Sequence, residues 1–325
     1  MDFNLEIFSA FTVLIIIGLF GNLFGLIVIS KKKLHKIGPQ TSYIAMFIFD
    51  WINLVTIFKP YLQYGLNIDI TTFGSLACKS YWYISYAFAT ISPMLNVYIS
   101  IKRFISIAYP SKKYILLKDN IQLAYIITLT LFNLGLYVPI GIYFDVITVS
   151  NNRTVCDFVD IDWLHTCGYI DLVNRVIIPS LLMIIFSILI IRTIFKSRSR
   201  MSSTSKVNKT FQKDVRFSLM SILLNIAYCV FSLPVSILLL FPNYWLNPLY
   251  VFFSFVFFLA YLANFYLILT ANRLFRGGFL SIFACSKNQQ QKNGRIVGET
   301  NVNSKPGARD EFSLQYRAGF SLQQI

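Results

Sequence analysis

Seven long apolar stretches are the feature of this 325-residue sequence that most constrains its fold. Each reaches or exceeds the roughly 20 apolar residues that a helix needs to cross the hydrocarbon core of a bilayer. They cover residues 7–30, 40–66, 76–109, 120–144, 169–195, 215–241 and 247–271. Charged residues make up only 13% of the chain, too few to cover soluble domains, and barrel strands would give shorter, alternating segments. The sequence therefore predicts an all-α, seven-transmembrane-helix bundle.

Basic residues gather on one side of these spans. Of the 29 lysines and arginines, 25 lie at the ends of odd-numbered spans, in the loops after them, or in the tail. The positive-inside rule makes that side cytoplasmic and leaves the amino terminus outside. The outer side has four basic residues, Lys59, Lys79, Arg153 and Arg175, against eight acids. These acids are Asp2, Glu6, Asp69, Asp145, Asp157, Asp160, Asp162 and Asp171. A basic inner face meets anionic lipid in any membrane protein, so the net charge of +15 does not indicate nucleic acid as a partner.

The loops and ends of the chain set its expected domains. Residues 1–6 form a short extracellular segment, too poor in positive charge for a signal peptide, and 7–271 form the membrane domain. Apolar residues at helical spacing predict a short amphipathic helix at 272–285 on the inner leaflet, followed by a disordered cytoplasmic tail at 286–325. The longest outer connection, 145–168, leaves ligand binding to the bundle and to this loop.

Four cysteines and one glycosylation sequon lie at the outer and inner membrane surfaces in this topology. Cys78 opens the third span on the outer side, where an oxidising compartment allows a disulfide to Cys156 or Cys167. Cys156 is favoured, because Cys167 lies close to the fifth span and its reach is limited. Asn152 begins an Asn-Arg-Thr sequon in the same loop and is an expected glycosylation site. Cys285, at the inner surface, is either palmitoylated or an unmodified thiol.

Polar residues inside the spans indicate a site in the bundle interior. Asp50 lies deep in the second span, where a charge is costly and usually marks an ion or switch site; the alternative is a neutral, hydrogen-bonded acid. Ser85, Ser92, Asn96 and Arg103 recur at spacings of 7, 4 and 7 in the third span. This spacing places them on one helical face, which we expect to line the interior.

A set of motifs in a fixed order covers most of the chain. They are Gly21-Asn22, Asp50, Thr71-Thr72-Phe73-Gly74, Cys78, Lys102-Arg103-Phe104, the span prolines Pro139, Pro179 and Pro234, Asn264-Phe265-Tyr266-Leu267-Ile268 and Phe275-Arg276. Over about residues 7–285 this set resembles the rhodopsin-like G protein-coupled receptors.

The resemblance implies a plasma-membrane receptor that passes the signal of an extracellular ligand to a G protein by outward movement of the sixth helix, with arrestin as a further partner. It implies a sodium ion held by Asp50, Ser92 and Asn264. It also implies that Arg103 serves G protein coupling, and that Asp214, at the inner end of the sixth span, pairs with Arg103 in the inactive state.

Several residues depart from the family pattern at the activation switch. Lys102 replaces the acid beside the motif arginine, and Ser232 replaces a tryptophan of the sixth helix. Ser187 and Ile268 replace the two tyrosines of the switch. These changes leave the fold expectation intact and raise an alternative function, a receptor-like protein that binds ligand without activating a G protein.

Two other classes of protein are disfavoured by the sequence. A transporter or channel would show several charges within the membrane and pairs of broken helices, whereas Asp50 alone stands in the apolar midplane. A metal-dependent membrane enzyme cannot be assembled from His35 and His165, which fall on opposite sides of the membrane.

The expected ligand class follows from two residues that the sequence lacks and from the negative charge of its outer side. No lysine lies in 247–271, where an opsin holds retinal, and Ser85 stands where amine receptors have an aspartate. The acidic outer face favours a cationic ligand, and Asn264-Phe265-Tyr266-Leu267 is similar to some invertebrate neuropeptide receptors, so we expect a peptide. The expected pocket residues, each aromatic of which could equally be core packing, are Tyr61, Tyr64, Tyr81, Ser85, Phe88, Tyr250 and Ser254.

Overall fold

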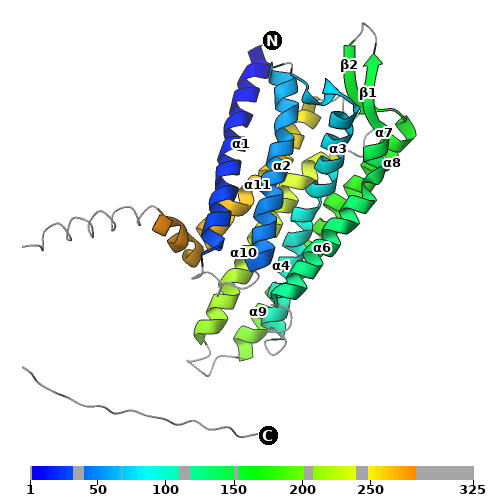
Figure 1. Cartoon of the computed structure of the whole chain (residues 1–325). Coiled ribbons are helices and arrows are strands. Elements are labelled where there is room, and N and C mark those ends of the chain that lie inside the picture. Colours follow the sequence, from blue (N-terminus) through cyan, green and yellow to red (C-terminus); the bar gives the residue numbers. More distant parts are fainter. Residues whose placement is uncertain are drawn as a thin grey trace, which may run out of the picture. The chain divides into compact units, whose positions relative to one another are not determined.

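A computed structural model describes residues 2–31, 40–66, 68–109, 118–149, 153–200, 208–238 and 248–282. Its helices run roughly side by side in a bundle, and a β-hairpin projects from one end of it (Figure 1). The elements are α1 (Asp2–Ile29), α2 (Gln40–Leu66), the 3-10 turn η2 (Ile70–Phe73), α3 (Ser75–Ala89), α4 (Ile91–Ala108), α6 (Asp119–Leu136), α7 (Val138–Tyr143), β1 (Phe144–Val149), β2 (Arg153–Phe158), α8 (Ile161–Asp171), the π turn η5 (Leu172–Ile177), α9 (Ile178–Arg200), α10 (Asn208–Leu238) and α11 (Pro248–Ala271), followed by a short helix, Arg273–Ile282.

These helices build the seven-span bundle that the sequence predicts. The third span is α3 with α4, the fourth is α6 with α7, and the fifth runs from α8 through η5 into α9. Four described stretches are long and apolar enough to cross a membrane by those measures alone: Thr12–Ile29, Ser75–Ala108, Asp162–Ser197 and Val215–Leu238. The pair Phe255–Ala271 and Arg273–Ile282 passes the same test together. The short helix Arg273–Ile282 bends away from α11 by 99°, and the expected helix after the last span is confirmed.

The fifth span starts earlier than the sequence analysis placed it, at Ile161 and not near residue 169. The Asp160 carboxylate accepts the backbone N–H of Asp162 at 2.9 Å and caps the first turn of α8. Asp162, His165 and Thr166 look like loop residues by polarity, but they occupy the first turns of a helix.

A hairpin that we did not predict fills the loop before α8. Its strands β1 and β2 are antiparallel, and Val146 pairs with Cys156. Cys156 forms the disulfide with Cys78 that the sequence analysis favoured, and Cys167 is a buried free thiol. The β-branched run Val146-Ile147-Thr148-Val149 was the available signal for a strand.

A second contact holds the base of the hairpin to the start of α3. Lys79 Nζ lies 3.1 Å from the Asp145 carboxylate. The Ser75 hydroxyl, the Val146 N–H and Lys79 all donate to Asp145, and they hold the pKa of its carboxyl below the usual range. The hairpin is thus fixed to α3 by one covalent and one ionic link.

Proline divides the third span into α3 and α4. Pro93 has no N–H, and its ring crowds the carbonyl four residues earlier, which belongs to Ala89 at the end of α3. The Tyr261 hydroxyl of α11 donates to this carbonyl at 2.9 Å. Lipid supplies no donor for a freed carbonyl, so the break in one helix is compensated by a side chain of another.

Pro179 has the same effect in the fifth span. The carbonyl four residues earlier belongs to Arg175, and the Tyr228 hydroxyl of α10 donates to it. The π turn η5 ends at Ile177, two residues before this proline, and such turns change which residues share a helical face. Arg175 lies within this turn, and Asp171 is the residue directly before it.

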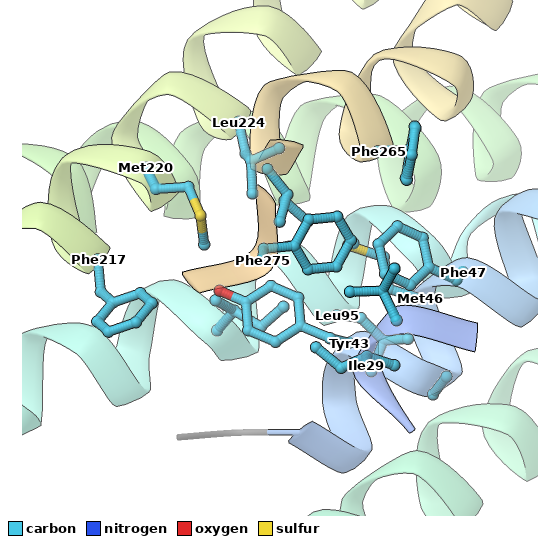
Figure 2. Close-up of a cluster of buried hydrophobic side chains, with 14 of the residues drawn as sticks. Ile29, Tyr43, Met46, Phe47, Leu95, Phe217, Met220, Leu224, Phe265 and Phe275 are labelled. Atoms are coloured by element: carbon cyan, nitrogen blue, oxygen red, sulfur yellow. The ribbon is translucent and has the colours of Figure 1, made fainter. Parts of the chain in front are cut away.

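Aromatic packing at the end of the bundle away from the hairpin joins the short terminal helix to the spans (Figure 2). Phe275 of that helix is fully buried, with its ring 6.3 Å from Phe47 and 5.9 Å from Phe265. A Cβ on Gly25 would lie 2.9 Å from the Phe47 ring, so α1 approaches α2 too closely there for a larger residue. Lys31 Nζ donates to the Ser281 hydroxyl at 2.9 Å and ties the same helix to the end of α1.

Tyr261→Phe should lower the free energy of unfolding by about 1–3 kcal/mol, the cost of leaving the buried Ala89 carbonyl without its donor. The purified protein in detergent should therefore unfold at a lower temperature. Tyr98→Phe is the matched control, because the Tyr98 hydroxyl is buried and has no hydrogen-bond partner. Equal unfolding temperatures for the two variants would contradict this account of the proline break.

Candidate functional site

Three polar clusters lie inside the described part of the bundle. The carboxylate cluster is Asp50, Ser92 and Asn264. The arginine cluster is Asp171, Arg175, Tyr137, Asn174, Asn133 and Thr90. The serine–asparagine cluster is Ser100, Ser187, Ser221 and Asn225. Buried polar groups inside a membrane bundle are costly unless they bond to one another, and each cluster joins at least three spans.

The carboxylate cluster brings together the three residues that the family resemblance connected. Asp50 of α2 is fully buried, and its two oxygens accept from the Ser92 hydroxyl of α4 and from Asn264 Nδ2 of α11, the latter at 2.8 Å. Both donors are neutral, and no described basic side chain is paired with Asp50. An ionised carboxylate in such a place is costly without a cation, so the cluster suits a small cation or a protonated acid.

The arginine cluster corrects two statements of the sequence analysis. Asp171 and Arg175 were counted as charges of the outer side, and Asp50 was taken as the one acid deep in a span. The structure places both residues in the interior of the fifth span, where Arg175 Nη2 pairs with Asp171 Oδ2. Asp171 is 4% exposed and Arg175 is 22% exposed at their side chains.

Hydrogen bonds from the fourth span hold Asp171 in place. The Tyr137 hydroxyl, at the junction of α6 and α7, donates to Asp171 Oδ1 at 3.1 Å and lies 3.1 Å from the hydroxyl of Thr90. Asn174 Nδ2 donates to Asn133 Oδ1 at 3.0 Å. The acid is therefore anchored to the third, fourth and fifth spans.

Aromatic rings surround the arginine. The Arg175 guanidinium carbon lies 5.9 Å from the ring centre of Tyr86 in α3 and 5.2 Å from that of Phe257 in α11. Tyr228 of α10 binds the Arg175 carbonyl. Because α3, α10 and α11 all touch it, Arg175 lies between spans and not on the lipid-facing surface.

The serine–asparagine cluster joins α10 to two other spans. Asn225 Nδ2 donates to the hydroxyls of Ser100 in α4 and Ser187 in α9, each at 2.9 Å. The Ser100 and Ser221 hydroxyls lie 3.0 Å apart. Ser187 is one of the residues that replaces a switch tyrosine, and the structure shows that its hydroxyl takes part in this contact.

Two basic side chains are buried at the end of α4 away from the hairpin. Lys102 is 3% exposed, and its Nζ lies 4.6 Å from the ring centre of Tyr98 without a hydrogen-bond acceptor. The Arg103 guanidinium lies 4.8 Å from the ring centre of Phe217 in α10. The motif arginine thus contacts the helix that the family resemblance expects to move.

The described members of the expected pocket differ in their surroundings. The Tyr81 hydroxyl donates to the Thr56 carbonyl of α2 at 2.6 Å, and the Phe88 ring lies 5.5 Å from that of Phe49. Both side chains contact α2, as expected if they pack in the core and do not contact a ligand. Ser85 has a buried hydroxyl.

The other expected site residues cannot be placed in detail. The side chains of Tyr61, Tyr64, Asp214, Tyr250 and Ser254 are not among those described, and Asn152 and Cys285 lie outside the described residues, as does the tail at 286–325. Their roles stay predictions.

A signal for the arginine cluster was present in the sequence. Asp171 and Arg175 are opposite charges four residues apart, so they share a helical face. They also stand within eight residues of Pro179, inside the same helical stretch. An ion pair at that spacing within a span is expected to face the bundle interior.

A family model described as 7 transmembrane receptor (rhodopsin family) matches residues 21–270. No curated protein matches the chain significantly.

Proposed function

Because the chain belongs to the rhodopsin family of seven-transmembrane receptors, we propose that it converts the binding of an extracellular ligand into activation of a G protein. In this proposal the protein lies in the plasma membrane with its amino terminus outside, arrestin is a further partner, and the short helix Arg273–Ile282 lies along the inner leaflet. The Cys78–Cys156 disulfide, which needs an oxidising compartment, and the basic loops at the opposite end support this orientation.

The observation that carries the proposal is the set of hydrogen bonds between α10 and its neighbours. Outward movement of α10 separates Asn225 from Ser100 and Ser187, so these bonds favour the closed bundle. Interhelical hydrogen bonds in membranes contribute about 0.6 kcal/mol each. A few such bonds are enough to bias a two-state equilibrium and weak enough for a ligand to overcome.

The ligand in this proposal is a peptide. Two outer acids are taken up in ion pairs, Asp69 with Lys59 and Asp145 with Lys79, and Asp171 is paired with Arg175 in the bundle interior. Asp157, Asp160 and Asp162 remain at the end of β2 and the start of α8. Their field attracts a cationic ligand towards the hairpin end of the bundle.

Asn225→Leu should raise basal signalling, because it removes the bonds to Ser100 and Ser187 and a longer contact to the Met183 carbonyl. At about 0.6 kcal/mol for each bond, the ratio of open to closed receptor rises roughly ten- to twenty-fold. Calcium and cyclic AMP reporters in cells, at matched surface expression, measure the effect.

Ser236→Ala is the control for that variant, because the Ser236 hydroxyl donates to the Ser232 carbonyl of its own helix. It should leave basal signalling unchanged. If neither variant changes basal output in any reporter, the rival function gains support: a receptor-like protein that binds ligand without activating a G protein, as the substitutions at Lys102, Ser232 and Ile268 suggest.

The proposal includes a sodium ion in the carboxylate cluster of the inactive receptor. A carboxylate, a hydroxyl and an amide oxygen are suitable ligands for a hard cation, and the buried Asp50 carboxylate has two neutral donors. The ion would neutralise that charge and join α2, α4 and α11.

Sodium chloride should raise the unfolding temperature of the purified wild type above its value in N-methylglucamine chloride at equal ionic strength. Asp50→Asn should abolish this difference, because the charge that attracts the cation is gone. Asp119→Asn, which alters an exposed acid, should keep it. A sodium effect of the same size in wild type and Asp50→Asn would exclude the site.

A further inference from the structure

The two members of the Asp171–Arg175 pair are not equally satisfied. Asp171 accepts on both oxygens, from Arg175 on Oδ2 and from Tyr137 on Oδ1. A guanidinium has five N–H donors, and Arg175 uses Nη2 on Asp171 while its Nε is buried without an acceptor. The pair therefore has donors to spare, whereas each oxygen of the acid already has a partner.

The solvent exposure of the two side chains also points to the arginine as the residue with free binding capacity. The Arg175 side chain keeps 22% of its surface accessible and that of Asp171 only 4%. Contacts with Tyr86 of α3, Phe257 of α11 and Tyr228 of α10 place the arginine between spans. Of the two residues, the arginine is therefore the one that a ligand atom can reach.

We propose that Arg175 is a ligand-contacting residue that takes a hydrogen-bond acceptor oxygen of the ligand, a carboxylate or a carbonyl, with the rings of Tyr86 and Phe257 beside it. Asp171 does not bind the ligand. It stays paired and fixes the arginine, because it accepts from the Tyr137 hydroxyl, which itself contacts Thr90 and Asn174.

This assignment rests on the proposed receptor function and narrows its ligand. A peptide has backbone carbonyls and, unless amidated, a terminal carboxylate, so it satisfies the arginine even when its net charge is positive. The acidic residues near the hairpin act on the approach of the ligand, and Arg175 acts on the group that reaches the interior. A ligand that binds only through an amine finds no free acceptor in this pair.

Three small probes of the same shape separate the chemistries: benzoate, benzamide and benzylamine. Thermal unfolding of the purified full-length receptor is followed against the concentration of each probe. Benzoate or benzamide, or both, should raise the unfolding temperature by about 2 °C or more at saturation, and benzylamine should not. The probe that gives the larger rise in unfolding temperature tells whether the natural ligand presents a carboxylate or a neutral carbonyl to Arg175.

Substitutions test whether the rise in unfolding temperature depends on Arg175. Arg175→Gln should lose it, and Lys79→Gln, which alters a cation at the base of the hairpin, should keep it. Asp171→Asn keeps the shape of the acid and removes its charge, so it should strengthen the benzoate shift by leaving the guanidinium without its counterion. This variant keeps the test informative if Arg175→Gln does not fold.

Stabilisation by benzylamine, a shift that survives in Arg175→Gln, or no shift with any probe would each overturn the assignment. The readout is binding to the purified protein and involves no G protein. A receptor that binds the acceptor probes through Arg175 and gives no signal in cells would refute the proposed signalling function and leave this contact standing.

Discussion

Backbone hydrogen bonding in a lipid environment is the constraint on which the rest of this structure depends. A helix satisfies its own backbone except where proline interrupts it, and the bilayer has no water to take the freed carbonyl. Here Pro93 and Pro179 free the carbonyls of Ala89 and Arg175, and tyrosines of α11 and α10 donate to them. The breaks in the third and fifth spans thereby become contacts with the sixth and seventh.

The polar clusters extend this pattern through the bundle. Asn264 joins α11 to the buried Asp50, Asn225 joins α10 to α4 and α9, and the anchored Asp171 presents Arg175 between α3 and α11. Of these contacts, those of Asn225 join helices whose relative positions would change when α10 moves. A ligand contact at Arg175 and the hydrogen bonds of Asn225 can therefore be coupled through α10, because the Tyr228 hydroxyl of that helix donates to the Arg175 carbonyl.

The sequence predicts those parts of this molecule that depend on local pattern. Apolar runs predict the spans, the family resemblance connects Asp50, Ser92 and Asn264, and the limited reach of Cys167 beside the fifth span favours Cys156 as the partner of Cys78. The spacing of Asp171 and Arg175 indicates that they share a helical face, but their partners on the other spans depend on how those spans pack together. The bond between Asn225 and Ser100 depends on the relative register of two spans, which no local pattern specifies.

The central claim is that contacts between α10 and α4 hold the receptor closed, and a cross-link between these helices tests it most directly. The hydroxyls of Ser100 and Ser221 lie 3.0 Å apart, so cysteines at both positions are placed to form a disulfide. In the Asn225→Leu background, oxidation of Ser100→Cys/Ser221→Cys should suppress basal signalling and reduction should restore it, while each single cysteine variant should be insensitive. Undiminished signalling from fully cross-linked receptor, with the bond verified by mass spectrometry, would contradict the account.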